Sequence, residues 1–293
     1  MKKQTPPKKQ LHPFSLLIVA MALCAGLYAV GSYITAYIPS PWGAGQFRPA
    51  VIIPAFFATI FGPMTGGVGA ALGTLIADSA KYGYPYPGSF LAAVWGNFIG
   101  FYLFGWILKK KFSWRRFVAA SNITLTLANA LVAFLYVFLF KILYLGNLDY
   151  KGTLDVQIFF SIGLTIWWFV TMLPFVLLVT PLLIRAAARA MPSIVPEDVR
   201  LYSINEDLPK TTFSLAFLVP GLIMVLTGLA ASYSILGDYI NSSLGEPTST
   251  VIRLMFYVSG GFLSILGVLI FTGQAFFWKD KLSEKEEITT KPE

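Results

Sequence analysis

The stretch "IFGPMTGGVGAALGTLIAD", residues 60–78, is rich in glycine and ends on an aspartate. A dinucleotide-binding turn needs the spacing G-x-G-x-x-G, but Gly67-Val-Gly69 has no glycine three positions further on. A P-loop needs Lys followed by Ser or Thr, and the stretch has no lysine. On a helix, however, one face carries the small residues Gly62, Gly66, Gly69, Gly73 and Ala77. We therefore predict a helix that packs closely on a neighbour, as membrane helices do.

The composition of the whole chain indicates where this helix lies. Of the 293 residues, 56% are hydrophobic and 12% are charged, whereas soluble domains have about 25% charged residues. We predict an all-α integral membrane protein embedded in the lipid bilayer. The net charge of +8 does not indicate nucleic-acid binding, because the basic residues lie at the ends of apolar runs, where they set membrane topology.

Seven apolar stretches follow one another along the chain, and Gly62-Pro63 interrupts the second. They cover residues 14–38, 49–80, 88–108, 117–145, 157–187, 212–236 and 251–278. A single-pass helix needs about 20 residues. If the second stretch is two short helices, most of the 22 basic residues fall on the side of both chain ends, as the positive-inside rule requires. We therefore predict eight transmembrane helices in the cell membrane, with both termini cytoplasmic.

These helices are expected to form two groups. The polar segment between them contains three prolines (Pro192, Pro196 and Pro209). The predicted parts are a cytosolic arm at 1–13, a six-helix substrate-binding domain at 14–187, a cytosolic linker at 188–211, a two-helix membrane extension at 212–278 and a charged cytosolic tail at 279–293.

Residues for catalysis or metal binding are scarce in this sequence. Cys24 is the single cysteine, and the single histidine, His12, precedes the first apolar run. No pair of carboxylates or His/Cys cluster is expected at membrane depth, so acid–base or metal chemistry has no residues to carry it. We therefore expect neither an enzyme nor a bound metal or cofactor.

The best candidates for ligand binding gather around the interrupted second stretch. Short, proline-broken membrane segments point to a transporter's binding site, and aromatic residues beside a few polar groups suit a planar heteroaromatic ligand. The predicted substrate-binding residues are Trp42, Gln46, Arg48, Asp78, Tyr82, Tyr84, Tyr86 and Asn97. Alternatives remain open: a local Asp78–Lys81 ion pair, Arg48 as an interfacial anchor, a tyrosine belt, and hydrogen bonds from Asn97 or Asn129 between helices.

Small residues also mark two other helices. Ala92, Gly96 and Gly100 form a small face in 88–108, and we expect it to contact the glycine face of 63–80. The first apolar run carries two further small pairs, Ala22/Gly26 and Ala25/Ala29. These pairs serve either internal packing or the docking of another membrane protein.

Three passages resemble a known family. They are "FRPAVIIPAFFATIFGPMTGGVGAALGTLIADSA" (47–80), "PGSFLAAVWGNFIGFYLFGWILKKK" (87–111) and "WWFVTMLPFVLLVTPLLIRAAAR" (167–189). They are similar to the second and third, fourth, and sixth helices of the substrate-capture (S) components of energy-coupling-factor (ECF) vitamin transporters. The resemblance covers about residues 14–190.

This resemblance implies a fold and a set of partners. It implies a six-helix core with a small-molecule site near the extracellular side, beneath the first, third and fifth loops. It further implies assembly with a transmembrane T subunit and cytosolic ATPases, which would supply the ATP hydrolysis. The family's A-x-x-x-A docking face would correspond to Ala25 and Ala29. The resemblance leaves the last two helices unexplained.

We therefore expect a membrane subunit that captures a vitamin-like molecule, such as riboflavin or another heteroaromatic compound. The alternative is a membrane sensor or assembly protein without a transport role, which the 188–211 segment, the extra helix pair and the charged tail would suit.

Overall fold

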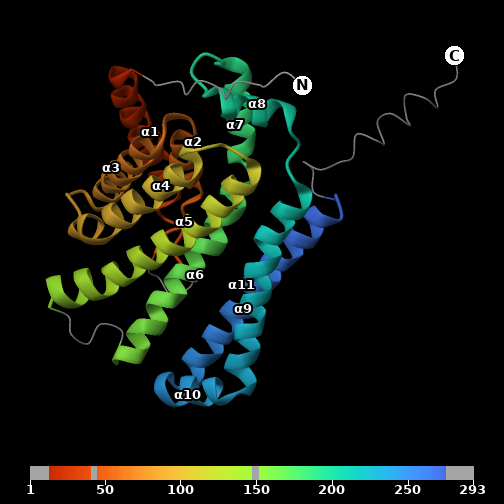
Figure 1. Ribbon diagram of the computed structural model, residues 1–293. Coiled ribbons are helices and arrows are strands. Elements are labelled where there is room, and N and C mark those ends of the chain that lie inside the picture. Colours follow the sequence, from red (N-terminus) through yellow and green to blue (C-terminus); the bar gives the residue numbers. More distant parts are fainter. Residues whose placement is uncertain (1–12, 41–44, 147–151, 275–293) are drawn as a thin grey trace, which may run out of the picture. The chain divides into compact units, whose positions relative to one another are not determined.

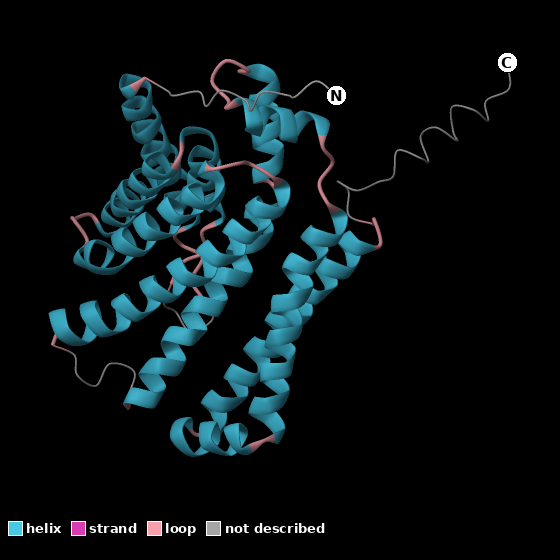
Figure 2. Cartoon of the chain, in the orientation of Figure 1, coloured by secondary structure: helices cyan, strands magenta, loops and turns pink. Residues whose placement is uncertain are grey.

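The computed structural model describes residues 13–40, 45–146 and 152–274, and every regular element in these segments is a helix (Figures 1 and 2). The chain divides into two compact units, one up to Asp207 and one from Leu208. Trp42, the predicted tail 279–293 and all of the predicted arm except Pro13 lie outside the described residues.

The first unit contains most of the helices. They are α1 (Phe14–Thr35), η1 (Pro49–Val51), α2 (Ile52–Phe61), α3 (Pro63–Tyr82), η2 (Ser89–Ala93), α4 (Val94–Lys109), α5 (Trp114–Phe134), η3 (Leu135–Tyr144), α6 (Leu154–Leu178), α7 (Thr180–Ala190) and α8 (Glu197–Asn205). The elements η2 and η3 are π-helical segments. The first leads directly into α4, and the second directly follows α5.

The predicted break at Gly62-Pro63 is confirmed. Gly62 has φ +93°, a conformation that favours glycine because other side chains are strained there. Pro63 then starts α3, at a position where its missing N–H leaves no helical hydrogen bond unmade. With 10 residues, α2 is about 15 Å long and cannot cross about 30 Å of hydrocarbon alone.

Six helical segments of the described chain are long and apolar enough to cross a membrane. They are Phe14–Thr35, Ser89–Lys109, Trp114–Tyr144, Leu154–Ala190, Lys210–Tyr233 and Glu246–Phe271. Neither α2 nor α3 is among these six. The count of eight membrane spans therefore remains a prediction, which requires that α2 and α3 also lie in the bilayer.

The glycine face of α3 packs against α1 and α2. A Cβ atom added to Gly69 would lie 2.6 Å from the Cβ of Cys24 in α1, and one on Gly73 would lie 2.8 Å from the carbonyl oxygen of Ala25. A Cβ on Gly66 would overlap Ala58 of α2. Only glycine lets these backbones approach so closely, so the predicted packing role of the stretch is confirmed.

The expected neighbour of the α4 small face was wrong. Gly96 and Gly100 of α4 lie against Ala128 of α5, not against α3. The helices α3 and α4 do pack together, but through Gly67 beside Phe98 and through Gly105 against Pro63. The sequence showed that both faces consist of small residues, but it did not show which helix each face contacts.

The segment predicted as a linker carries a folded helix. Within 188–211, α8 packs on α7, and Asp198 Oδ2 accepts a 2.8 Å hydrogen bond from the backbone N–H of Phe112. The Arg185 Nε donates a 3.0 Å bond to the carbonyl of Ser203. These contacts attach α8 to the first unit.

The second unit is a helical hairpin. It comprises α9 (Lys210–Tyr233), the short α10 (Ile235–Leu244) and α11 (Glu246–Phe271), with α9 and α11 side by side (Figure 1). Ser214 Oγ donates a 2.8 Å bond to the carbonyl of Gly267, and Arg253 Nε donates a 2.8 Å bond to the carbonyl of Ala231. Hydrogen bonds from side chains to backbone carbonyls therefore help to hold this hairpin together.

Candidate ligand-binding site

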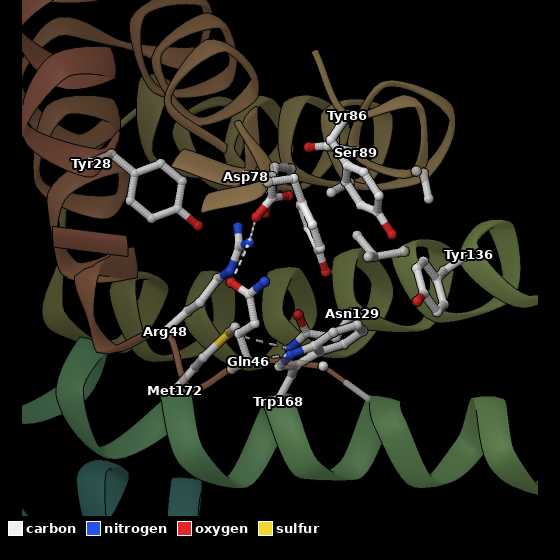
Figure 3. A pocket seen from close by; sticks show the side chains of 17 residues that line it. Tyr28, Gln46, Arg48, Asp78, Tyr86, Ser89, Asn129, Tyr136, Trp168 and Met172 are labelled. Atoms are coloured by element: carbon white, nitrogen blue, oxygen red, sulfur yellow. Dashed lines mark hydrogen bonds and ion pairs between the residues drawn. The ribbon is translucent and has the colours of Figure 1, made fainter. Parts of the chain in front are cut away.

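A pocket lies in the first unit, where α1, the segment 45–48, α3, η2, α4, α5, η3 and α6 converge (Figure 3). The pocket is partly open, and its empty space is about 660 Å³ when the solvent at its mouth is included. Its lining combines aromatic and apolar side chains with a few polar groups, which is the usual composition of a small-molecule site.

An ion pair joins two elements of this pocket. Arg48, which precedes η1, bonds through Nη2 to Oδ1 of Asp78 near the end of α3. Only 8% of Arg48 and 5% of Asp78 are exposed. Because a buried charge is costly without a partner, each residue compensates the charge of the other.

A polar network extends from this pair. Arg48 Nη1 donates to Thr74 Oγ1 over 3.3 Å, and Arg48 Nη2 also donates to Gln46 Oε1 over 3.0 Å. Asn97 Nδ2 of α4 donates a 2.9 Å bond to the same Thr74 hydroxyl. Thr74 and Asp78 are four residues apart and therefore share one face of α3. The network links the 45–48 segment, α3 and α4 around one end of the pocket.

Aromatic side chains supply flat surfaces in the same pocket. The rings of Tyr82 and Tyr86 are stacked with centroids 4.0 Å apart, and Tyr86 meets Phe140 edge-on at 5.5 Å. Burial raises the pKa of Tyr86 well above its usual value, so its phenol stays neutral at physiological pH. On the α6 side, Trp168 lines the pocket with its indole.

One buried hydroxyl in the lining has no hydrogen-bond partner. It belongs to Ser89 of η2, which is 1% exposed, whereas the buried hydroxyl of Tyr28 in α1 interacts with Arg48. Asn129 of α5 makes a weak contact of 3.7 Å from Nδ2 to the sulfur of Met172. Unpaired buried polar groups are unfavourable, so these groups are suited to bind a polar ligand.

The structure brings together most of the residues predicted for the site. Gln46, Arg48, Asp78, Tyr82, Tyr86 and Asn97 all line the pocket. Tyr84 does not line it and is 53% exposed, while Trp42 lies outside the described residues. Contact of any of these residues with a ligand remains a prediction.

Other lining residues had not been proposed as ligand contacts. They are Tyr28, Ser89, Asn129, Tyr136, Trp168 and Met172, among others. Asn129 had been noted only as a possible bond between helices. A polar residue on an apolar helix was the available signal for Asn129 and Ser89, but nothing in the local sequence distinguishes Trp168 from its neighbour Trp167.

The alternative of a local Asp78–Lys81 ion pair is not supported. Lys81 Nζ donates a 2.6 Å bond to the carbonyl of Ala36, after the end of α1, and lies over the ring of Tyr37. Arg48 forms the ion pair with Asp78 instead, which also means that Arg48 is not an exposed anchor.

The two small pairs of α1 have different surroundings. Ala25 and Ala29 are buried, with Ala25 directly against Gly73 of α3. Ala22 and Gly26 are exposed, and a Cβ on Gly26 would meet no atom within 4 Å. In this conformation, only the Ala22/Gly26 pair is open to a partner.

In the described residues, no three of the His, Cys, Asp and Glu side chains are grouped to hold a metal ion. The pocket residues can instead donate and accept hydrogen bonds and stack against rings. This arrangement suits reversible binding.

One comparison with known proteins gives a match. A family model described as "ECF-type riboflavin transporter, S component" matches residues 15–184, which include every residue that lines the pocket. No curated protein and no solved structure shows significant similarity to the chain.

Proposed function

Because this chain belongs to the S components of ECF-type riboflavin transporters, we propose that it captures riboflavin or a similar heteroaromatic vitamin for an ATP-driven importer. S components are the binding subunits of membrane transporters and not enzymes. Multi-pass insertion in the membrane agrees with the six long apolar helices.

The observation that carries the substrate assignment is the composition of the pocket. Stacked tyrosines and Trp168 offer flat apolar surfaces, and the Arg48–Asp78 network offers donors and acceptors beside them. A flat ring system with polar substituents can use both kinds of contact at once. A purely aliphatic ligand would leave the polar groups unsatisfied, which costs affinity.

The proposed topology has eight membrane segments with both termini in the cytoplasm. In it, the short α2 and the glycine-rich α3 together enter and leave the bilayer, surrounded by α1 and α4. Such irregular segments are tolerated where protein encloses them or where they line a cavity. The pocket would then lie toward the extracellular side, because Arg48 and Asp78 are at the ends of these segments away from Gly62.

Transport requires partners, because the chain has no P-loop to bind ATP. We propose that a T subunit contacts the exposed Ala22/Gly26 pair of α1 and that two cytosolic ATPases supply the energy. Small residues let two membrane helices approach closely, so this pair is a suitable docking point. Ala25 and Ala29 could take part only if α1 moved away from α3.

Ligand titration of the purified protein tests the binding role. Riboflavin, thiamine and biotin are added separately to the protein in detergent, and quenching of tryptophan fluorescence is followed. We expect saturable riboflavin binding that Arg48→Ala weakens at least about 10-fold, because the substitution leaves Asp78 buried and unpaired. Absence of binding for all three vitamins, with no ATPase co-purifying, would favour the sensor or assembly role.

A further inference from the structure

A charged surface lies at the end of the first unit where three apolar segments meet. The segments Ser89–Lys109 and Leu154–Ala190 end there, and Trp114–Tyr144 begins there. The Arg185 guanidinium, near one of these ends, lies 5.7 Å from the centroid of the Trp114 ring at another. In a chain that spans a membrane, such a surface lies where the hydrocarbon gives way to lipid headgroups and water.

Most of the exposed charge on this surface is positive. In the segments 109–116 and 185–207, the exposed basic side chains are Lys109, Lys110, Lys111, Arg115, Arg116 and Arg189. The exposed acidic side chains of the same segments are Glu206 and Asp207. Asp207 interacts with Arg185, and the Asp198 carboxylate accepts the bond from the Phe112 N–H. A net positive charge therefore remains for an external anion.

Contacts join the turn between α4 and α5 to α8, which lies beside α7 (Figure 1). Lys111 Nζ lies 5.7 Å from the centroid of the Tyr202 ring in α8. Arg116 Nη1 donates a 3.2 Å bond to the carbonyl of Lys111. The basic turn and α8 thus form one surface, which we call the basic face.

The helix α8 adds an apolar pair to the basic face. Leu201 and Ile204 are three residues apart and share one side of the helix, and each is 44% exposed. The buried residues of α8, Val199 and Ser203, lie on the other side. Glu197 is half-buried in the first turn, where the helix dipole favours a carboxylate. Large apolar side chains next to basic ones are typical of a helix that lies in the membrane interface.

We propose that the basic face binds anionic phospholipids, which in the proposed topology are those of the cytoplasmic leaflet. Its lysines and arginines contact lipid phosphates, while Leu201 and Ile204 insert at the boundary between headgroups and acyl chains. A soluble anion would use the charges but leave the apolar pair without a contact. Lipid binding at this surface is separate from vitamin capture and does not depend on the ligand of the pocket.

Native mass spectrometry of the purified full-length protein in detergent tests this proposal. Phosphatidylglycerol and phosphatidylcholine are added in equal amounts, and the bound copies of each lipid are counted. We expect the wild-type protein to retain phosphatidylglycerol at least about 10-fold better, because each Lys or Arg near the surface attracts anionic lipid. The preference should decrease as the salt concentration rises, since salt screens exposed charges.

Substitutions at exposed positions separate charge from structural damage. Combining Lys109→Gln, Lys110→Gln and Arg115→Gln should reduce the preference to about 2-fold or less. The matched control combines Lys109→Arg, Lys110→Arg and Arg115→Lys, which keeps the charges and should keep the preference. Leu201→Gln with Ile204→Gln should lower the retention of both lipids about 3-fold and leave their ratio unchanged. Thermal unfolding of each variant checks that it folds, and the salt dependence of the wild-type protein tests the charge effect without any substitution.

Three results would overturn the proposal. They are equal retention of the two lipids by the wild-type protein, an unchanged preference in the folded glutamine variant, and displacement of phosphatidylglycerol by soluble glycerol phosphate. The last result would show a site for a free anion. Unchanged retention in the Leu201 and Ile204 variant would overturn the part assigned to α8. Failure to bind riboflavin would affect only the proposed function, because no residue of the basic face lines the pocket.

Discussion

The indole Nε1 of Trp168 donates a 3.0 Å hydrogen bond to the backbone carbonyl of Gln46, 122 positions earlier in the chain. The bond attaches the 45–48 segment to α6. Gly45, with φ +82°, brings the backbone so close that an added Cβ would lie 3.2 Å from the Trp168 ring. Trp168 therefore helps to fix the segment from which Gln46 and Arg48 reach the pocket.

Trp168→Phe should weaken ligand binding about 3- to 10-fold, because it removes a hydrogen bond with a net value of about 0.5–1.5 kcal/mol while keeping a ring. Isothermal titration calorimetry with riboflavin measures the change. Trp167→Phe is the matched control, since Trp167 Nε1 has no hydrogen-bond partner and the residue does not line the pocket. Equal losses for the two variants would contradict the role assigned to Trp168.

Tyr86→Ala should reduce riboflavin affinity about 10-fold, because it removes a ring that lines the pocket and stacks on Tyr82. Tyr84→Ala is the control and should change affinity less than about 2-fold, since surface substitutions are usually near neutral. Tyr84 belongs to the same tyrosine cluster but is largely exposed and outside the lining. A larger loss for Tyr84→Ala would mean that the tyrosine cluster binds ligand on its outer surface.

Much of the polar end of the site could be predicted from the order of the helices along the chain. Arg48 precedes a short helix and Asp78 lies near the end of the next one, so a turn at Gly62 returns both to the same end of the α2–α3 pair. The same argument extends to Tyr82 and Tyr86, which directly follow. No knowledge of side-chain directions was needed.

The other half of the site depends on helix rotation, which the sequence did not reveal. Tyr28 and Trp168 lie within long apolar helices in which every face is hydrophobic, so periodicity gives no inward direction. Tyr136 itself lies in the π-helical segment η3, where the helical register shifts. The sequence also did not show which helix packs on each glycine face. A row of small residues allows close packing but does not specify the neighbouring helix.

Gly96→Ala should lower the thermal unfolding midpoint by about 2–10 °C, because overpacking a close helix contact costs about 1–3 kcal/mol. The new Cβ would overlap Val132 and lie 3.0 Å from the carbonyl oxygen of Ala128 in α5. Gly26→Ala, which meets no atom within 4 Å, is the control and should not lower the midpoint. Differential scanning fluorimetry in detergent measures both, and an unchanged midpoint for Gly96→Ala would argue against the α4–α5 contact.

Gly26→Leu should leave riboflavin binding intact while reducing co-purification with the T subunit and ATPases at least about 10-fold, because a large side chain prevents close helix approach. Gly26 is exposed on α1 and is not part of the pocket. Gly261→Leu in α11 is a control at another glycine with open space around it. Normal assembly of the Gly26→Leu protein would show that the T subunit binds elsewhere.

A chain that ends after Asp207 should bind riboflavin with an affinity within about 2-fold of the full chain, because it keeps the whole first unit. Every residue that lines the pocket precedes this point, and the first unit ends there. A chain that ends after Ala190 is the informative comparison, because it also lacks α8 and the bond from Phe112 to Asp198. We expect this shorter chain to unfold at a lower temperature. Loss of binding in the longer truncated chain would instead mean that the second unit contributes to the site.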